Sequence, residues 1–574
     1  MAQSVRKDST LDIDRIFDSA AVYRRRVSVT RSSHRESVSC ENGLPINKDA
    51  VGGKAANQDY APSPSDVSAG NERAKTASDH QQYMPMRYAV RYCYVAIFWA
   101  VLMAAPLITV GYETALVPSL FAYGAFQNVY RPINTKNIGD VPAEWQSGIV
   151  IASAASQLLG LCFAPYLVRR IGYPKSTAAA LIVAGLVHLV LYWSPGAESK
   201  LALFLVGELF LGFPCGIFQA VVLPYVSDIT PIRVKECVAA FINIFWLIGQ
   251  LLAAGLLRGF SDIDDDLWGV RALILVQYAW LVPMTILAAL APESPVFLNR
   301  MGRDDDALAM LRRLYRSDPL FNEQNSLAMV TGINSHGVHG VQSSSSTGLL
   351  DCFKSPNLGR TEIALMVNLT QQLAGSTFTF FIVEILRRAG LSQGDALYVN
   401  IGVCLLCIAA TIMSMVCLGI YGRRTLWLGG LAVQIVCLVL AGSLGFFIRS
   451  TGISWIVTTV LVLSAVAYNL TTGPVCYTIT AEIPSARLSV ATNSIARGVN
   501  VAFSIVNYIL VPNLMEARPA GWGVGLPAAL LWAGTSSVCF IWAWFRLPEM
   551  KDRTPAEIDH LSERKINARA WAST

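Results

Sequence analysis

Two stretches of the sequence, "VRRIGYPKS" (Val168–Ser176) and "IYGRRTLWL" (Ile420–Leu428), resemble each other although they lie in opposite halves of the chain. Each follows a long apolar run and contains two arginines and a glycine. Two further pairs repeat in the same order: "YVSDITPIR" (Tyr225–Arg233) with "TAEIPSARL" (Thr480–Leu488), and "PESPVFL" (Pro292–Leu298) with "LPEMKDRT" (Leu547–Thr554). These pairs predict an internal duplication.

Apolar runs between the repeated motifs make up most of the chain. The 574 residues are 53% hydrophobic and 15% charged, whereas soluble domains carry about 25% charged residues. A helix needs about 20 apolar residues to cross a membrane. The expected spans are residues 92–122, 145–168, 176–194, 201–227, 237–257, 272–291, 363–386, 396–420, 425–447, 454–481, 489–513 and 522–545. The sequence therefore predicts an all-α membrane protein with twelve transmembrane helices, six in each half.

Polar intervals divide the chain into five segments. "APSPSDVSAGNERAK" lacks an apolar period and predicts disorder, whereas "RMGRDDDALAMLRRLYRSD" predicts an amphipathic helix and "HGVHGVQSSSST" a flexible linker. The expected segments are a disordered tail (1–87), a first six-helix bundle (88–291), a middle loop with the amphipathic helix (292–361), a second six-helix bundle (362–547) and a C-terminal tail (548–574).

Basic residues indicate how the chain is oriented in the membrane. They gather in both tails, in the middle loop and in every second short loop, and such residues favour the cytoplasmic side. We therefore expect both termini and the middle loop in the cytoplasm. This orientation explains the net charge of +6, so the charge does not indicate a nucleic-acid partner. Most of the 12 cysteines lie within apolar runs, where cysteine behaves as a small hydrophobe, so we expect no metal and no cofactor.

The motifs in their order resemble the major facilitator superfamily of sugar transporters, and within it the fungal α-glucoside (maltose-type) permeases. The resemblance rests on "GYETAL", "GELFLGFPCGIFQ", "WLIGQLLAAGLL", "PESPVFL", "QQLAG", "GRRTLWL" and "GPVCYTITAEIPSARL", and it extends from about Tyr88 to about Glu557. It implies the major facilitator fold, with two six-helix bundles and a substrate site between them at mid-membrane.

The same resemblance implies a charge latch on the cytoplasmic side. Carboxylates near opposing arginines can pair when that side closes and separate when it opens, as alternating access requires. Alternatively, these charges only orient the helix ends. The first copy lacks the family's second arginine after the glycine, which predicts a weaker latch there. The latch candidates are Arg169, Arg170, Asp228, Arg233, Glu293, Arg423, Arg424, Glu482, Arg487 and Glu549.

Polar side chains inside the spans are candidates for substrate contact, because positions facing lipid would reject them. Amides suit sugar hydroxyls, since they both donate and accept hydrogen bonds, and an aromatic ring provides a face for stacking. Each amide could instead form an interhelical hydrogen bond worth about 1 kcal/mol. The substrate-binding candidates, most of them matched to family positions, are Gln250, Gln371, Gln372, Thr377, Asn469 and Tyr477.

Three positions depart from the family pattern. Thr377 and Gly498 stand where relatives carry asparagine, and another family asparagine falls near Cys407. The smaller set of amides leaves open a second hypothesis, a carrier or exporter of another small molecule such as a glycosylated secondary metabolite. A third hypothesis is a nutrient sensor with a transporter fold, although the tail after Glu549 is short for signalling.

Glu113, in "GYETAL", is a carboxyl group inside an apolar span, where an ionised group costs about 3 kcal/mol or more unless it is paired or hydrated. The resemblance matches it to the span-1 acid of proton-coupled sugar carriers, with Glu208 and Arg497 as companions. A buried acid tuned toward neutrality can take up a proton on one side and release it on the other. Val110 and Gln157 replace two further acids of the relatives, so uniport and a purely structural ion pair remain alternatives to proton symport.

These features predict a secondary active sugar or α-glucoside transporter that works by alternating access. The expected partners are a small-molecule substrate, protons and membrane lipid, and the expected location is the plasma membrane, as a monomer. We do not expect an enzyme, because the sequence has no Walker-type nucleotide loop and its histidines fall in loops and tails apart from His188.

Overall fold

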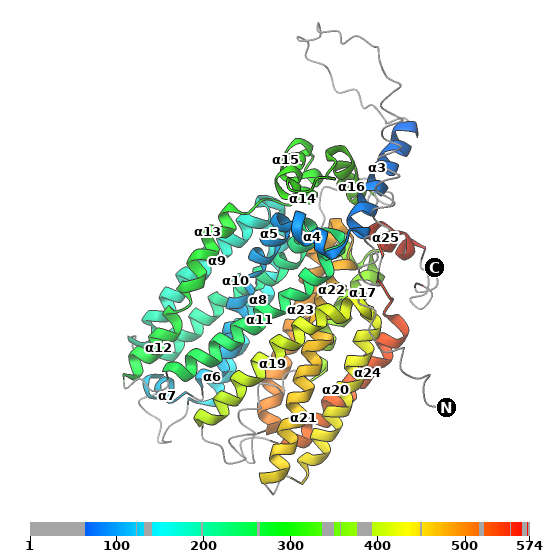
Figure 1. The fold of residues 1–574 in the computed structure, drawn as a ribbon. Helices are drawn as coiled ribbons and strands as arrows, with labels where there is room; N and C mark the ends of the chain where they lie inside the picture. Colours follow the sequence, from blue (N-terminus) through cyan, green and yellow to red (C-terminus); the bar gives the residue numbers. More distant parts are fainter. Residues whose placement is uncertain are drawn as a thin grey trace, which may run out of the picture.

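The computed structural model describes residues 64–121, 123–130, 141–196, 199–260, 265–335, 349–355, 357–375, 393–447, 451–515, 522–551, 553–564 and 571. Long helices run side by side between the two ends of the molecule (Figure 1). One end carries α3 (Pro64–Tyr83), α14 (Pro295–Arg300), α15 (Asp304–Tyr315), α16 (Glu323–Ser335) and α25 (Pro555–Glu563). We call it the tail side. The short helix α7 (Gly124–Tyr130) lies at the opposite end.

Two helix bundles follow one another along the chain. The first contains α5 (Tyr94–Ala104), α6 (Leu107–Leu120), α8 (Ala143–Ile171), α9 (Tyr173–Trp193), α10 (Lys200–Ile229), α11 (Ile232–Phe260), α12 (Asp266–Leu275) and α13 (Tyr278–Leu290). The second contains α17 (Leu358–Leu373), α19 (Gln393–Ile420), α20 (Arg423–Gly445), α21 (Thr451–Leu470), α22 (Thr472–Glu482), α23 (Ser489–Met515) and α24 (Ala529–Arg546). The bundles meet where α11 packs on α19 and α22, and where α8 and α10 pack on α23.

Eleven helices among the described residues are long and apolar enough to cross a membrane. They coincide with eleven of the twelve expected spans, and the pairs α5–α6, α12–α13 and α21–α22 each form one span. The expected seventh span, 363–386, coincides at its start with α17, and residues 376–386 lie outside the described residues. The predicted all-α membrane class is confirmed.

Close approach of helices within the first bundle depends on glycine. A Cβ atom on Gly111 of α6 would lie 2.1 Å from the carbonyl oxygen of Trp246 on α11, and one on Gly249 of α11 would lie 2.3 Å from that of Ile108. Small residues of this kind allow the backbones of transmembrane helices to pack directly against each other. Large apolar side chains such as Leu186, Phe210 and Val538 are exposed instead, as expected for faces that contact lipid.

The last part of the expected disordered tail is helical in the structure. Helix α3 and the start of α4 (Met86–Tyr92) fall within residues 1–87, and α3 packs along α16. Ala77 and Gln81 of α3 are buried, and the Gln81 side chain accepts a hydrogen bond from the Ile232 backbone N–H at 3.4 Å. Contacts of this tertiary kind explain a helix that the local pattern does not predict.

A buried carboxylate holds this helical tail segment against the middle loop. Nε2 of His80 lies 3.2 Å from one oxygen of Asp318, and the Tyr88 hydroxyl donates to the other at 2.6 Å. Burial by itself would raise the pKa of Asp318, but the hydrogen bonds from His80, Tyr88 and the Leu320 N–H outweigh it, so the pKa is lowered. The pairing therefore favours the ionised carboxylate.

The middle loop contains the expected amphipathic helix as α15. Ala307, Leu311 and Leu314 are buried, whereas the three aspartates that begin the helix, Asp304–Asp306, are exposed. The predicted linker at 336–347 lies outside the described residues.

Candidate functional site

A polar cavity lies between the two bundles. It encloses about 700 Å³ of space not occupied by atoms, part of it open to solvent. The first bundle contributes two carboxyl groups, two amides and an indole, and the second contributes two amides and a phenol. The carboxyl, amide and aromatic residues of the lining are Glu113, Gln157, Glu208, Gln219, Trp246, Gln372, Asn500 and Tyr508.

Glu113 is buried in the cavity wall on α6 and is 8% exposed. Its Oε1 atom accepts a hydrogen bond from Nε2 of Gln277 at 2.5 Å and lies 3.3 Å from Nε2 of His188. The expected partner, Arg497, makes its hydrogen bonds elsewhere. In this conformation His188 of α9 and Gln277, at the break between α12 and α13, contact the carboxylate instead.

Glu208 on α10 faces the same cavity and is 2% exposed. It is close enough to Glu113 to interact with it electrostatically, and Ser153 on α8 hydrogen-bonds its side chain. Its Oε2 atom is buried without a hydrogen-bond partner among the described residues. Two acids of the first bundle thus share one cavity.

Arg497 on α23 crosses from the second bundle to the first. Its Nη2 and Nε donate to Oε1 of Gln219 at 2.8 and 3.3 Å, and its Nη1 donates to Oε1 of Gln371 at 3.3 Å. The guanidinium lies 5.5 Å from the ring centroid of Trp246 and 5.7 Å from that of Tyr477. Hydrogen bonds and two aromatic faces therefore fix this cation in a buried interbundle position.

The paired glutamines of α17 differ in their surroundings. Gln371 is buried, and its side chain binds Arg497 and the Gly473 carbonyl oxygen. Gln372 lines the cavity, donates to Oδ1 of Asn500 at 3.3 Å and accepts from Nδ2 of Asn507 at 3.3 Å. Only the second of the pair therefore faces the space in which a substrate could bind.

Three further expected substrate contacts lie away from the cavity lining or outside the described residues. Gln250 is half-buried on α11 and does not line the cavity. Asn469 is buried where the bundles meet, and its Oδ1 accepts from Nδ2 of Asn243 at 3.0 Å. This contact fits the alternative of an interhelical hydrogen bond. Thr377 lies outside the described residues.

Several cavity residues are not among the predicted substrate contacts. Gln219 and Trp246 lie within quoted motifs, and Gln157 was treated only as a missing acid. Nε2 of Gln219 donates to Oε1 of Gln157 at 3.2 Å, so these amides form a pair on the cavity wall. The rule that polar residues inside spans are functional candidates would have selected them, together with Gln277 and Asn500.

The bundles are joined on the tail side by a buried arginine. Arg423, at the start of α20, donates to Glu482 at 2.9 Å and forms an ion pair with Glu236 of α11. Glu236 belongs to the first bundle and was not predicted. The Ser227 hydroxyl of α10 also donates to the Ala481 carbonyl oxygen at 3.1 Å. These contacts link the two bundles on the tail side in this conformation.

The repeated glutamates have the same role in both halves. Oε1 of Glu293 accepts from the Tyr173 N–H at 3.1 Å, and Oε1 of Glu549 accepts from the Arg423 N–H at 2.9 Å. The residues preceding these amides, Gly172 and Gly422, have φ values of +87° and +45°. Each glutamate therefore caps the start of a helix at a glycine, which bears out the internal duplication in three dimensions.

Tyr173 stands in the first copy where Arg423 stands in the second. Its hydroxyl hydrogen-bonds Asp228, which also accepts from Ser294 Oγ at 2.8 Å. A neutral phenol replaces the guanidinium there, and an ion pair like that of Arg423 and Glu482 is absent at Tyr173.

The remaining latch candidates contribute less in this conformation. Arg169 and Arg170 are exposed, and neither they nor Arg487 forms an ion pair with another described residue. Arg424 donates to the Trp544 carbonyl oxygen at 2.8 Å, and Arg233 lies near Glu236. Arg423 and Glu482 are thus the latch candidates that form a buried ion pair in this conformation.

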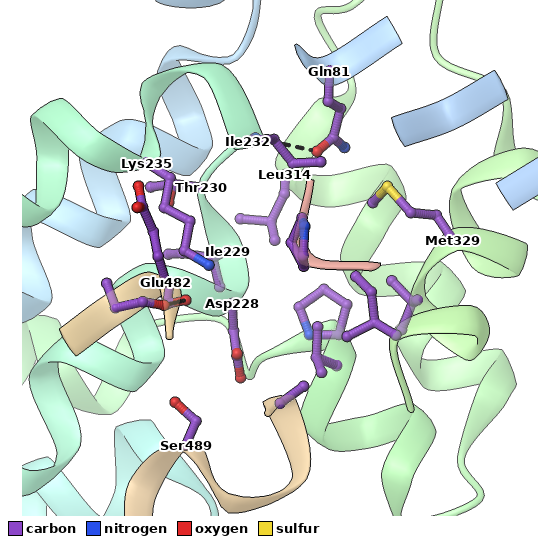
Figure 2. Close-up of a pocket in the computed structure, with 18 of the residues that line it drawn as sticks. Gln81, Asp228, Ile229, Thr230, Ile232, Lys235, Leu314, Met329, Glu482 and Ser489 are labelled. Carbon is purple, nitrogen blue, oxygen red and sulfur yellow. Dashed lines mark hydrogen bonds between the residues drawn. The ribbon is translucent and has the colours of Figure 1, made fainter. Parts of the chain in front are cut away.

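A second pocket lies on the tail side, where both bundles meet the middle loop and α25. Figure 2 shows Asp228, Lys235 and Glu482 on one wall, with Gln81 of α3 reaching the Ile232 amide. Lys235 is close enough to interact electrostatically with Glu482, Asp228 and Asp559. This arrangement places two of the four predicted latch acids, Asp228 and Glu482, around a cation that is not among the predicted latch residues.

Two bundles of repeated design around a buried polar cavity define a membrane carrier of the major facilitator type. The sequence model of the "Sugar (and other) transporter" family matches residues 99–561. The chain belongs to this family.

The general alpha-glucoside permease of Saccharomyces cerevisiae is 29% identical over 505 residues, 87% of this chain and 80% of its own length. The maltose permease MAL61 of Saccharomyces cerevisiae is 29% identical over 507 residues, 87% of this chain and 81% of its own length. Among solved structures, the proton:xylose symporter XylE bound to 6-bromo-6-deoxy-D-glucose superposes with a TM-score of 0.68 at 18% identity, covering 83% of this chain and all of that one. This last likeness supports the fold.

Proposed function

We propose that this protein carries an α-glucoside or a related sugar across the membrane by proton symport. The similarity to alpha-glucoside and maltose permeases supports this substrate class. The single observation that carries the proposal is the cavity between the bundles, where carboxyl groups and neutral amides lie together.

Amides support a polyhydroxylated substrate. Gln157, Gln219, Gln372 and Asn500 line the cavity and compensate for the amides missing at Thr377 and Gly498. Tyr508 and Trp246 add aromatic surface on which a sugar ring could stack. These amides make the alternative substrate, a glycosylated secondary metabolite, less favoured, because that hypothesis rested on a scarcity of amides in the cavity.

The contacts between the bundles on the tail side support alternating access. Residues 88–291 and 362–547 would rock as two bodies, with the contacts of Arg423 broken when the tail side opens. The basic loops favour a cytoplasmic tail side with both termini inside, and we expect a monomer in the plasma membrane.

Uptake in a transporter-deficient yeast host tests the proposal. Labelled maltose and glucose should accumulate when the protein is expressed, and a protonophore should abolish accumulation. Uptake that is unchanged by the protonophore would contradict proton symport. If no α-glucoside or hexose in a substrate panel were taken up, the proposed substrate class would be contradicted. The same substrates can be tested in an export assay. If only cells that lack the protein retain a substrate, the result would favour an exporter.

A further inference from the structure

His188 is a buried titratable residue to which the proposed transport cycle has so far given no role. It lies on α9 with a side chain that is 0% exposed. Its ring packs edge-on against Tyr278 of α13, with centroids 6.3 Å apart. Glu113, which reaches it from α6, lines the cavity. The histidine thus stands behind the acid, on the side away from the cavity.

The hydrogen bonds of His188 determine where its hydrogens lie. Nδ1 is 2.7 Å from the carbonyl oxygen of Ala184, one turn earlier on α9. A carbonyl only accepts, so Nδ1 carries a hydrogen. In a neutral imidazole Nε2 then presents a lone pair.

That lone pair faces a carboxyl oxygen. Nε2 is 3.3 Å from Oε1 of Glu113, and an ionised carboxylate also presents lone pairs. The contact is attractive only when a hydrogen lies between the two atoms. Glu113 and His188 therefore fit together best with one shared proton, held as O–H···N or as O⁻···H–N⁺.

Most of the other polar groups around this pair have hydrogen-bond partners of their own. The Tyr112 hydroxyl donates to the Leu273 carbonyl oxygen, and the Tyr278 hydroxyl donates to the Gly185 carbonyl oxygen. Neither phenol therefore donates a hydrogen bond to Glu113 or His188. Gln277 only donates to Glu113 through its amide N–H. Cys215 and Glu208 approach from α10, and two ionised carboxylates this close would repel each other, which favours a proton on this cluster of acids. Arg497 is engaged by Gln219 and Gln371.

We propose that Glu113 and His188 form one proton-binding site, in which His188 is the second acceptor of the coupled proton. The proton enters from the cavity onto the Glu113 carboxylate, and the O–H bond so formed faces Nε2 of His188. Transfer to Nε2 breaks that bond and forms an N–H bond, and release reverses the two steps. This inference rests on the proposed proton symport.

His188→Gln tests the site, because glutamine can hydrogen-bond Glu113 but cannot hold a proton. Labelled maltose is measured in two ways, as accumulation against a gradient and as exchange in cells preloaded with unlabelled maltose. H188Q should lose accumulation by a larger factor than it loses exchange. Losing one of two acceptors lowers the proton affinity of the pair, so the pH of half-maximal uptake should move to a more acidic value. His560→Gln, at an exposed histidine on α25, is the matched control.

A double variant keeps the inference falsifiable if H188Q folds poorly. Glu113→Gln should lose accumulation, and E113Q/H188Q should be no worse than E113Q, because both residues hold the same proton. Additive losses, or equal losses of accumulation and exchange in H188Q at normal surface abundance, would overturn the shared site and indicate a structural histidine. Wild-type uptake without proton coupling would overturn symport itself, whereas wild-type coupling that persists unchanged in H188Q would overturn only the role of His188.

Discussion

Arg423 and Glu236 form an ion pair that joins α20 of the second bundle to α11 of the first. Arg423 is 1% exposed and also binds Glu482. Removing one partner of a buried ion pair costs about 3 kcal/mol or more, because the remaining charge stays buried without compensation. Arg423→Gln leaves Glu236 and Glu482 facing each other, with only the weaker attraction of Arg233 and Lys235. We expect the closed tail side to lose about 3 kcal/mol relative to the open one, a population shift of about 100-fold.

Labelling of the tail side measures this shift. Ser489→Cys places a thiol on the wall of the tail-side pocket, and its reaction with a maleimide in inside-out vesicles should be faster when R423Q is also present. Labelling is compared with protein that keeps Ser489, which corrects for the native cysteines. Arg169→Gln, at an exposed arginine without a described ion pair, should leave the rate unchanged. Equal rates in R423Q and R169Q would contradict the latch.

Gly172 should tolerate no side chain. Its φ of +87° with a ψ of 175° belongs to a region that is essentially restricted to glycine, and a Cβ atom there would lie 1.8 Å from Oε2 of Glu293. Gly172→Ala should destabilise the protein by about 1–3 kcal/mol, seen as a lower melting temperature in detergent. Gly429→Ala on α20 is the control, because a Cβ there meets nothing within 4 Å. Equal melting temperatures of the two variants would contradict the cap.

Stability should depend on pH through Glu293. Burial raises the pKa of Glu293 to about 7, partly offset by hydrogen bonds from the Ser294 and Tyr173 N–H groups. A carboxyl pKa that is higher in the folded state than its unfolded value of about 4.3 means that folding favours the protonated form. The stabilisation is therefore complete below the unfolded pKa and is lost as the pH rises through about 7.

Glu293→Gln mimics the protonated form and tests this dependence. The melting temperature of E293Q minus that of the wild type should therefore increase as the pH is raised from 5 to 8. Glu323→Gln provides a control of opposite sign, because the hydrogen bond from exposed Arg312 lowers the pKa of Glu323. The stabilisation that ionised Glu323 provides is present at pH values above its unfolded pKa, so it does not change between pH 5 and pH 8. Parallel pH curves for E293Q and wild type would rule out the raised pKa.

The membrane spans could be predicted from the sequence because the length and hydropathy of a transmembrane helix are local properties. The duplication could be predicted as well, because its motifs recur at the ends of helices. Helix α3 could not be predicted, since its contacts with α16 and Asp318 come from residues far away in the chain. Local patterns carry no signal for such docking.

The site was predicted only in part for the same reason. Glu113 could be identified as an acid in an apolar run, but its neighbours depend on how α6 packs against α9 and on the break between α12 and α13. His188 lies in the otherwise apolar stretch "AGLVHLVLYW", and this isolation of a polar residue was the available signal. Glu236 was missed because it is adjacent to a basic cluster and resembles an ordinary helix-end charge.

Arg497 should not be replaceable by lysine. Its guanidinium donates to Gln219 and Gln371 while lying over the rings of Trp246 and Tyr477, and an ammonium group cannot reproduce that planar geometry. A hydrogen bond to a charged group is worth about 1.5–3 kcal/mol, so Arg497→Lys should lower the initial rate of maltose uptake about 10- to 100-fold at equal surface abundance. Arg170→Lys is the matched control, because Arg170 also lies over a ring, that of Tyr166 at 5.4 Å, but on an exposed face. If R497K and R170K transported alike, the guanidinium would be only a counter-charge, and the interbundle network around it would have no part in transport.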